Sequence, residues 1–278
     1  MTRAALLQLC SSDDPIANLA TTTAMVHEAA KGGATFILTP EVTNCVSGSR
    51  ARQEAVLCHE EEDPTLAGLC ATSAELGVWI LIGSLALKTN DPDGRFANRS
   101  FLINPSGQIV ARYDKIHMFD VTVSQTETYR ESAGYRPGED AVLARTPFGN
   151  IGMTICYDIR FPHLYRQLAQ AGAEILTIPA AFSPVTGAAH WEPLMRARAI
   201  ETGCYVLAPA QTGHHLSKTE AKRKTYGHSI AVSPWGEVLV TAGTEPCVSY
   251  VDIDRQTVAQ ARGRIPSSLL SQRFNPPQ

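Results

Sequence analysis

A thiol, a carboxylate and an amine each follow an apolar segment of this chain that reads as a strand. Cys156 follows IGMTI, Glu41 follows TFILTP, and Lys115 follows IVARYD. A thiol is a poor nucleophile until it is deprotonated, and a nearby carboxylate can take that proton. An ammonium group stabilises an oxyanion better than a neutral donor does. The three residue types together predict a nucleophilic cysteine with a base and an oxyanion partner.

Each of these residues alone also has a structural interpretation. Cysteine is among the most buried residue types, and Cys10, at the end of the first apolar segment, is a fair example of a packed thiol. Glu41 alone would be a loop carboxylate, and Lys115 alone would be a solvated surface lysine. Ligands of α/β sheets gather beyond the carboxyl ends of strands, so the coincidence of the three at strand ends favours one shared site. A sharp turn after Cys156 would offer the Tyr157 backbone N–H as a second oxyanion donor.

The elements that must position these residues occur in the same order twice. The first half predicts strands at 5–10, 35–40 and 78–85, helices ending at Lys31 and covering 64–76, and a hairpin at 100–113 with the turn NPSG. The second half predicts strands at 151–156, 174–180 and 204–210, helices at 161–172 and 190–202, and a hairpin at 228–243 with the turn SPWG. We interpret this order as an internal duplication of a β-α-β-α-β-hairpin unit.

The alternation of strands and helices predicts an α/β fold. Each half can form a mixed sheet with helices on one face, and the bare sheet faces would then pack together. We therefore expect a four-layer α-β-β-α sandwich with internal pseudo-two-fold symmetry. Each half needs the other to bury its sheet, so residues 1–278 are expected to form a single domain. The long irregular stretch 117–140 is too structured in composition to be a linker, and loops of that length are often functional.

Composition limits the function classes. The chain has 278 residues, of which 44% are hydrophobic and 18% charged, which is typical of a soluble enzyme-sized protein. A net charge of -3 gives no electrostatic case for nucleic acid. Seven cysteines without a CxxC pair suggest free thiols in a reducing compartment, and no spacing typical of a metal site occurs. The first apolar run is too short for a signal peptide or a membrane span, so we expect a cytoplasmic protein without membrane partner, metal or cofactor.

Three segments resemble the nitrilase superfamily, the carbon–nitrogen hydrolases. They are LTPEVTN around Glu41, RYDKIHMFD around Lys115, and ICYDIRFPHLYRQLAQAGAEIL around Cys156, and the resemblance covers essentially the whole chain. It implies a catalytic triad of these three residues and a second glutamate at Glu131 in YRESAGYRPGE. It also implies the four-layer sandwich, and homodimers or higher homo-oligomers built by stacking sandwiches.

Within the superfamily the sequence is similar to the Nit branch, through CYDIRFP, PVTGAAHWEPLMRARAIETGCYV and YGHSIAVSPWGEV. The run ARAIETGCYVLAPAQ is closer to the deaminated glutathione amidases than to the omega-amidases. This resemblance implies hydrolysis of a small amide, deaminated glutathione, to 2-oxoglutarate and cysteinylglycine through a cysteine thioester. An omega-amidase acting on 2-oxoglutaramate and an N-carbamoyl amino acid hydrolase would use the same triad and remain alternatives.

A carboxylate-bearing amide needs a cationic partner and a pocket. Arg160 is the candidate for a substrate carboxylate, because its planar fork suits bidentate binding, and a structural salt bridge is the alternative. Phe182 and Thr186 follow the strand predicted at 174–180 and would line the pocket together with Tyr157, unless they only pack in the loop. The basic segment 214–224 either attracts an anionic substrate or is a solvated loop.

Other chemistries could in principle use Cys156. A Cys-His enzyme would use His163, His190 or His228 as its base. A cysteine phosphatase needs arginine six positions after the cysteine, where this chain has Pro162. A non-catalytic interaction protein on an amidase scaffold predicts loss of the triad, whose residues are present.

Overall fold

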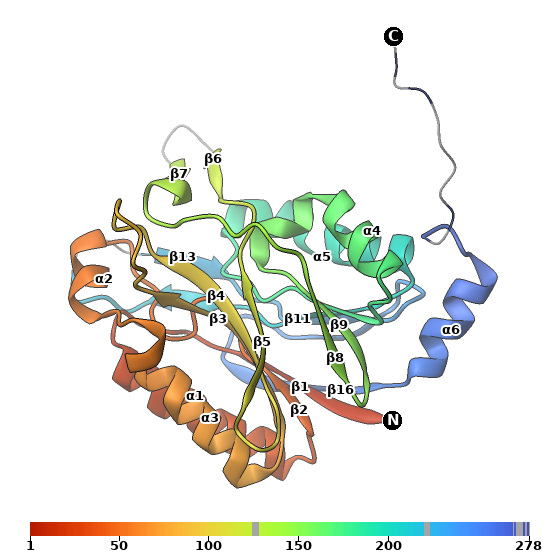
Figure 1. The fold of residues 1–278 in the computed structure, drawn as a ribbon, viewed down its shortest axis with the longest axis horizontal. Helices are drawn as coiled ribbons and strands as arrows, with labels where there is room; N and C mark the ends of the chain where they lie inside the picture. The colour runs from red at the N-terminus through yellow and green to blue at the C-terminus, as the bar shows by residue number, and fades with distance from the viewer. Residues whose placement is uncertain (124–127, 220–222, 269, 271–274, 276, 278) are drawn as a thin grey trace.

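Two six-stranded mixed sheets form the centre of the structure, with helices on their outer faces (Figure 1). The computed structural model describes residues 1–123, 128–219, 223–268, 270, 275 and 277. The first sheet has the order β16-β1-β2-β3-β4-β5, formed by Cys247–Ile253, Thr2–Gln8, Phe36–Leu38, Trp79–Leu87, Ala97–Ile103 and Ile109–Asp114. The second has the order β15-β14-β11-β10-β9-β8, formed by Val238–Thr241, Ile230–Val232, Tyr205–Ala208, Ile175–Thr177, Gly149–Met153 and Val142–Thr146.

The alternation of side chains along β1 shows why the sheets stack. Ala4 and Leu6 join the core that also contains Met153 of the second sheet. Ala5 and Leu7 point to the other face and pack with residues of helices α1 (Pro15–Lys31) and α3 (Pro64–Leu76). Both faces of this strand are therefore apolar, one toward a sheet and one toward helices. Helices α4 (Pro162–Gln170) and α5 (Pro184–Thr202) cover the outer face of the second sheet, which completes the four-layer α-β-β-α sandwich (Figure 1).

The predicted duplication is confirmed. In the first half β1, β2 and β3 are parallel neighbours, and β4 and β5 continue the sheet as a hairpin. In the second half β9, β10 and β11 are parallel neighbours, and β14 and β15 continue that sheet. The sequence did not predict the edge strands: β16 pairs antiparallel with β1, and β8 pairs antiparallel with β9.

Several predicted elements have shifted bounds, and two of these differences lie next to predicted site residues. The strand predicted at 151–156 ends at Met153, and Cys156 instead opens the 3₁₀ helix η3 (Cys156–Arg160). Helix α5 begins at Pro184 rather than at residue 190, because Pro184 is well suited to a first helical position although Val, Thr and Gly follow it. Among the residues that the structure describes, no helix is both long and apolar enough to cross a membrane.

Short elements connect these layers. They are helix α2 (Arg50–Val56), the 3₁₀ helices η1 (Glu60–Glu62) and η2 (Glu131–Ala133), and strands β6 (Asp120–Thr122), β7 (Thr128–Arg130), β12 (Thr212–His215) and β13 (Arg223–Tyr226). β6 and β7 pair as an antiparallel hairpin within the irregular stretch 117–140, and β12 pairs with β13. The segments between the main layers are therefore built partly from hairpins.

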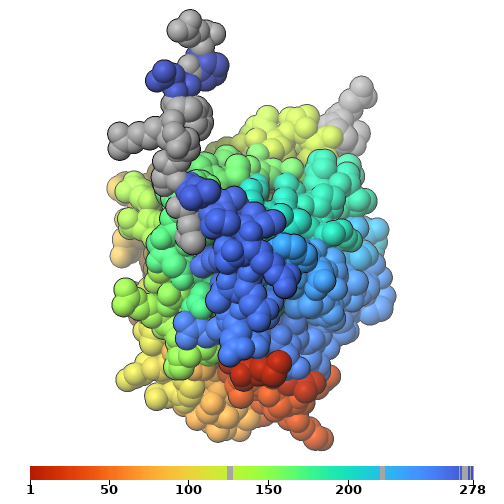
Figure 2. Space-filling model, turned by 90° about the vertical axis from the view of Figure 1, so that its right-hand side faces the viewer, coloured from red at the N-terminus to blue at the C-terminus, as the bar shows by residue number. Residues whose placement is uncertain are grey.

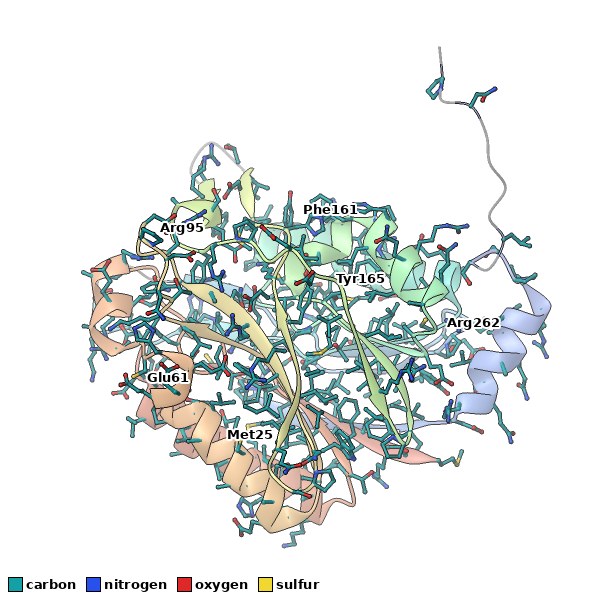
Figure 3. The ribbon with its side chains drawn as sticks, in the orientation of Figure 1. Met25, Glu61, Arg95, Phe161, Tyr165 and Arg262 are labelled. Carbon is teal, nitrogen blue, oxygen red and sulfur yellow. The ribbon has the colours of Figure 1, made fainter. Side chains whose placement is uncertain are left out.

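The C-terminal helix α6 (Arg255–Arg264) lies on the surface of the sandwich (Figure 2). The side chain of Arg262, in α6, lies between this helix and the body of the fold (Figure 3). It donates hydrogen bonds to the carbonyl oxygens of Thr202 at 3.1 Å and Ala173 at 2.6 Å. These contacts tie the end of the chain to the second half.

Gly83 in β3 allows two loops to approach each other closely. A Cβ atom at this position would lie 2.0 Å from the carbonyl oxygen of Thr39 and 2.5 Å from Cβ of Pro179. Thr39 leads into the loop that carries Glu41, and Pro179 leads into the loop that carries Ala181. Only a residue without a side chain lets these two loops meet across the sandwich.

We predict that Gly83→Ala destabilises the protein by about 1–3 kcal/mol or more, because backbone atoms that cannot move aside fill the space of the new methyl group. Urea unfolding followed by circular dichroism measures the change. Gly263→Ala is the matched control: it lies in α6 with nothing within 4 Å of the added atom, so it should be neutral or slightly stabilising. A Gly83→Ala protein as stable as the wild type would refute the close-approach explanation.

Candidate active site

A cavity of about 830 Å³ lies where the chain leaves β2, β5 and β9. This volume is within the usual range for small-molecule sites. Seven of the eight residues predicted for the site line it: Glu41, Lys115, Glu131, Cys156, Tyr157, Phe182 and Thr186. The fold therefore brings together residues that lie far apart in the sequence.

Glu41 lies three residues after the end of β2 and is 4% exposed. Its Oε1 accepts hydrogen bonds from Nζ of Lys115 and from Nδ2 of Asn98, both at 2.9 Å, and its Oε2 accepts one from the Ala181 N–H at 2.8 Å. Burial alone would raise the pKa of Glu41. The positive charge of Lys115 and the hydrogen bonds from Lys115 and the Cys156 thiol outweigh burial, so the pKa is lowered. Glu41 is therefore an ionised carboxylate next to a thiol, as a general base must be.

Lys115 directly follows β5 and is 2% exposed. Its Nζ lies 2.9 Å from Oε1 of Glu41 and 2.8 Å from each carboxylate oxygen of Glu131. Burial opposes the charge of Lys115, but the carboxylates of Glu131 and Glu41 outweigh it and raise the pKa well above its ordinary value. Lys115 is therefore an ammonium group inside the cavity.

The hairpin of β6 and β7 places Glu131 beside Lys115. Asp120 pairs with Arg130 in this hairpin, so the next residue, Glu131, returns to the start of β6. Its Oε2 accepts a hydrogen bond from the Phe119 N–H at 2.6 Å. The second glutamate thus reaches Lys115 through a local turn of the chain.

Cys156 has a backbone conformation that presents its side chain. Its φ of 49° is positive, which is uncommon for residues other than glycine. Such strained backbone conformations often occur at functional sites. The Cys156 N–H donates to the carbonyl oxygen of Pro179 at 2.9 Å, which fixes the turn. Burial and the negative charge of Glu41 raise the thiol pKa well above its ordinary value, although Lys115 acts in the other direction. The resting pair is therefore a thiol and a carboxylate, not a thiolate and an acid.

Three further predicted residues form part of the cavity wall. Tyr157 follows Cys156 in η3, and N–H groups in the first turn of a helix have no intrahelical acceptor, so its N–H can donate to a ligand. Phe182 is buried against the ring of Trp191, with 5.1 Å between ring centroids. Thr186 lies in the first turn of α5. This wall is mainly aromatic.

Arg160 is not among the residues that line the cavity. Its guanidinium group lies 5.7 Å from the Phe182 ring centroid, and its Nη2 lies 3.2 Å from Nδ1 of His190. Phe182 lines the cavity, so the Arg160 guanidinium lies beside a lining residue without lining the cavity itself. The role of Arg160 as the carboxylate partner therefore stays a prediction.

The described residues contain no Cys-His arrangement at the cavity. His163 and His190 are exposed, and none of the residues that line the cavity is a histidine. Nδ1 of His228 lies 2.9 Å from the carbonyl oxygen of Tyr226. A carboxylate, not an imidazole, is the group that contacts the thiol.

Asn98 in β4 is a residue of the site that the sequence analysis missed. Its Nδ2 donates to Oε1 of Glu41 at 2.9 Å and lies 3.4 Å from Oε1 of Glu131. The backbone carbonyl oxygen of Asn98 accepts from the backbone N–H of Lys115 at 3.0 Å. The side chain is buried below the two carboxylates. The register of the β4–β5 hairpin pairs Arg99 with Asp114, so the turn NPSG, which the sequence did predict, places residue 98 opposite 115.

Asp158 connects the Cys156 turn to the Lys115 segment. The fully buried carboxylate accepts hydrogen bonds from the Ile155 N–H at 2.8 Å, from the Tyr113 hydroxyl at 2.6 Å and from the His117 N–H at 3.0 Å. Tyr113 and His117 each lie two residues from Lys115. The relative position of thiol and ammonium therefore depends on one buried acid.

Comparison with known proteins places this geometry among amide-cleaving enzymes. Residues 3–263 match the carbon–nitrogen hydrolase family. A Yersinia enterocolitica protein named deaminated glutathione amidase is 41% identical over 236 residues, which cover 84% of this chain and 80% of that protein. The Mus musculus protein of the same name is 40% identical over 268 residues, covering 94% of this chain and 80% of that one.

Solved structures agree with these matches. The C. elegans NitFhit protein has a TM-score of 0.86 and 31% identity, and the match covers 95% of this chain and 63% of that chain. Saccharomyces cerevisiae Nit3, described as a member of branch 10 of the nitrilase superfamily, has a TM-score of 0.81 and 27% identity over 95% of this chain and 94% of its own. The fold is therefore shared along almost the whole sequence.

We predict that Asn98→Asp moves the acid limb of the kcat/KM profile to higher pH. A third carboxylate beside Glu41 and Glu131 disfavours ionisation of Glu41, which must be ionised to accept the thiol proton. Asn104→Asp is the matched control, because it lies in the turn of the same hairpin and its accepting Oδ1 is retained. The measurement is amide hydrolysis as a function of pH for wild type and both variants.

The wild-type profile supplies the baseline. Since the pKa of Glu41 is lowered and those of Cys156 and Lys115 are raised, kcat/KM should be flat from about pH 6 to about pH 8 and fall only in more acidic solution. An acid limb of the wild-type profile with an apparent pKa of about 6.5, the ordinary value for histidine, would contradict a carboxylate base. An Asn98→Asp profile that superimposes on the wild type would show that Asn98 does not act on Glu41.

Proposed function

The chain belongs to the carbon–nitrogen hydrolase family, and from this premise we propose that it hydrolyses a small carboxylate-bearing amide through a thioester on Cys156. The observation that carries the proposal is the contact of an ionised Glu41 with both the Lys115 ammonium and the Cys156 thiol. These are a base, an oxyanion partner and a nucleophile in one cavity.

The first half of the reaction forms the thioester. Glu41 accepts the thiol proton while the sulfur of Cys156 attacks the amide carbon, and the carbonyl π electrons move to the oxygen. The Lys115 ammonium and the Tyr157 N–H hold this oxyanion. When it collapses, the carbon–nitrogen bond breaks and Glu41 returns its proton to the departing nitrogen.

The second half releases the acid. Glu41 takes a proton from water, and the resulting hydroxide attacks the thioester carbon in the same oxyanion site. Collapse of the second intermediate expels the sulfur, which recovers its proton from Glu41. The products are a carboxylic acid and an amine, and the enzyme returns to its thiol and carboxylate state.

Glu131 and Asn98 act on the triad, not on the substrate, in this proposal. An ammonium has three donors, and Nζ of Lys115 contacts one oxygen of Glu41 and both oxygens of Glu131. When Glu131 keeps a single hydrogen bond, one N–H can turn toward an oxyanion. Glu131 fixes the position of Lys115 and keeps it charged. Asn98 holds the carboxylate of Glu41 at the distance that the thiol requires.

The proposed substrate is deaminated glutathione, giving 2-oxoglutarate and cysteinylglycine. Several relatives at 38–41% identity carry the name deaminated glutathione amidase, including proteins of bacteria and mammals. An anionic amide suits a cavity whose lining includes four cations other than Lys115, namely Arg50, Arg130, Arg223 and Lys224. An omega-amidase acting on 2-oxoglutaramate and an N-carbamoyl amino acid hydrolase are the alternatives.

We also propose that the chain is a single domain that forms homodimers or higher oligomers in the cytoplasm. Exposed apolar side chains on α5 and in the β14–β15 hairpin, among them Val185, Ile200 and Trp235, support a partner surface. The seven cysteines are all free, which supports a reducing compartment.

We predict the highest kcat/KM for deaminated glutathione in a panel with 2-oxoglutaramate and N-carbamoyl amino acids, measured by product formation. Cys156→Ala should lose nearly all activity, because it removes the thiol that contacts Glu41. Cys10→Ala, an exposed thiol that follows the equivalent strand of the first half, is the control and should keep full activity. Lys115→Ala should cost about 100- to 1000-fold, as for other oxyanion donors.

Two results would count against different parts of the proposal. Amide hydrolysis that survives in purified Cys156→Ala would exclude the thioester mechanism. A higher kcat/KM for 2-oxoglutaramate or for an N-carbamoyl amino acid would exclude only the choice of substrate.

A further inference from the structure

The cations that line the cavity differ in how fully their donors are engaged. Arg50 donates to the Gly134 carbonyl oxygen at 2.8 Å and to the Glu54 carboxylate at 2.9 Å, and its guanidinium lies over the ring of Phe96. Arg130 donates to two carbonyl oxygens, at 3.2 and 2.7 Å, of its own hairpin. Both side chains therefore have structural partners.

Arg223 at the start of β13 is different. It is partly buried and lines the cavity, and within the described residues it donates only to the carbonyl oxygen of Ala181, at 3.3 Å. It forms no ion pair with any acid in the described part of the chain. A guanidinium group has five donors, and its fork geometry matches a carboxylate. Arg223 therefore presents unused donors and a positive charge to the cavity.

Ala181 locates this charge relative to the reacting atoms. Its N–H donates to Oε2 of Glu41 at 2.8 Å and also interacts with the sulfur of Cys156, while its carbonyl oxygen accepts from Arg223. One residue, Ala181, thus lies between the guanidinium and both the base and the nucleophile. Consistent with this proximity, the charge of Arg223 contributes to the lowered pKa of Glu41.

We propose that Arg223 binds a carboxylate on the acyl part of the substrate, so that the enzyme selects monoamides of short dicarboxylic acids. The spacing of one residue with a hydrogen bond on either side matches an acyl chain of a few carbon–carbon bonds, each about 1.5 Å long. The inference rests on the proposed amidase function. It assigns to Arg223 the role of carboxylate partner, for which the sequence predicted Arg160.

This placement also separates the candidate substrates. Deaminated glutathione and 2-oxoglutaramate share the same acyl group, with its carboxylate on the acid side of the scissile bond. In N-carbamoyl amino acids the carboxylate lies on the amine side. If Arg223 binds a carboxylate on the acyl side, it contributes to binding of deaminated glutathione and 2-oxoglutaramate. It does not contribute to binding of N-carbamoyl amino acids.

A structural brace is the competing explanation for Arg223. If its only task is to hold the Ala181 carbonyl, its loss would disturb the Glu41 loop and slow every amide alike. If it binds a substrate carboxylate, its loss would slow only amides that carry one. The comparison therefore needs two amides that differ only in this group.

The test compares glutaramate with pentanamide, which has the same five-carbon chain without the carboxylate. For Arg223→Gln, kcat/KM for glutaramate should fall about 10- to 100-fold, mainly through KM, as for a lost hydrogen bond to a charged group, while pentanamide is unaffected. Arg223→Lys should restore part of the loss, since the charge remains without the fork. Lys218→Gln is the control: it removes an equal charge from a side chain that pairs with Asp14 outside the cavity.

Calorimetric binding of glutarate gives a second readout that needs no turnover. Wild type and Lys218→Gln should bind glutarate, and Arg223→Gln should bind it about 10- to 100-fold more weakly. That pattern supports the role of Arg223 even if the wild type hydrolyses no amide, which would sink only the proposed function. An equal loss on both amides, or unchanged glutarate binding by Arg223→Gln, overturns the inference.

Discussion

The structure depends on a buried ammonium group held between two carboxylates. Removing Lys115, Glu41 and Glu131 from water costs several kcal/mol per ion, and only close contacts with full hydrogen bonding can offset that cost. The remaining carboxylate lone pairs are accordingly served by the N–H groups of Ala181 and Phe119 and by the amide of Asn98. Two acids and one ammonium leave one net negative charge beside Cys156, so the sulfur stays a thiol until a carbonyl group arrives to take up charge.

The fold delivers to this cluster segments that lie far apart along the chain. Glu41 and Lys115 come from two strands of the first sheet, and Cys156 comes from a strand of the second. The sandwich must therefore hold its two sheets in a fixed relation at one edge. Gly83 permits the close approach there, and Asp158 ties the cysteine turn to the residues on either side of Lys115. The packing between the two sheets therefore also fixes the geometry of the reacting groups.

Much of this could be predicted from the sequence, because the signals were local. Apolar runs, helix caps and the two similar turns gave the order of the elements, and the residues just beyond strand ends gave Glu41, Lys115 and Cys156. The edge strands β8 and β16 were missed because only pairing with distant strands makes them part of a sheet. Arg160 was chosen because its planar fork suits a carboxylate, but it is not among the residues that line the cavity. Asn98 acts through a contact with a residue more than 40 positions away, which no local pattern encodes. The basic segment 214–224 drew attention to Arg223, but only the contact with Ala181 locates it relative to Glu41.

The most direct test of the account is the intact mass of the enzyme quenched in acid during turnover of deaminated glutathione. The account predicts a species heavier by one 2-oxoglutaryl group, with peptide mapping that places the group on Cys156, and its disappearance as substrate is exhausted. Two results would contradict the account. One is turnover without any acylated species when the acid quench is faster than hydrolysis of the thioester, and the other is acylation of a residue other than Cys156.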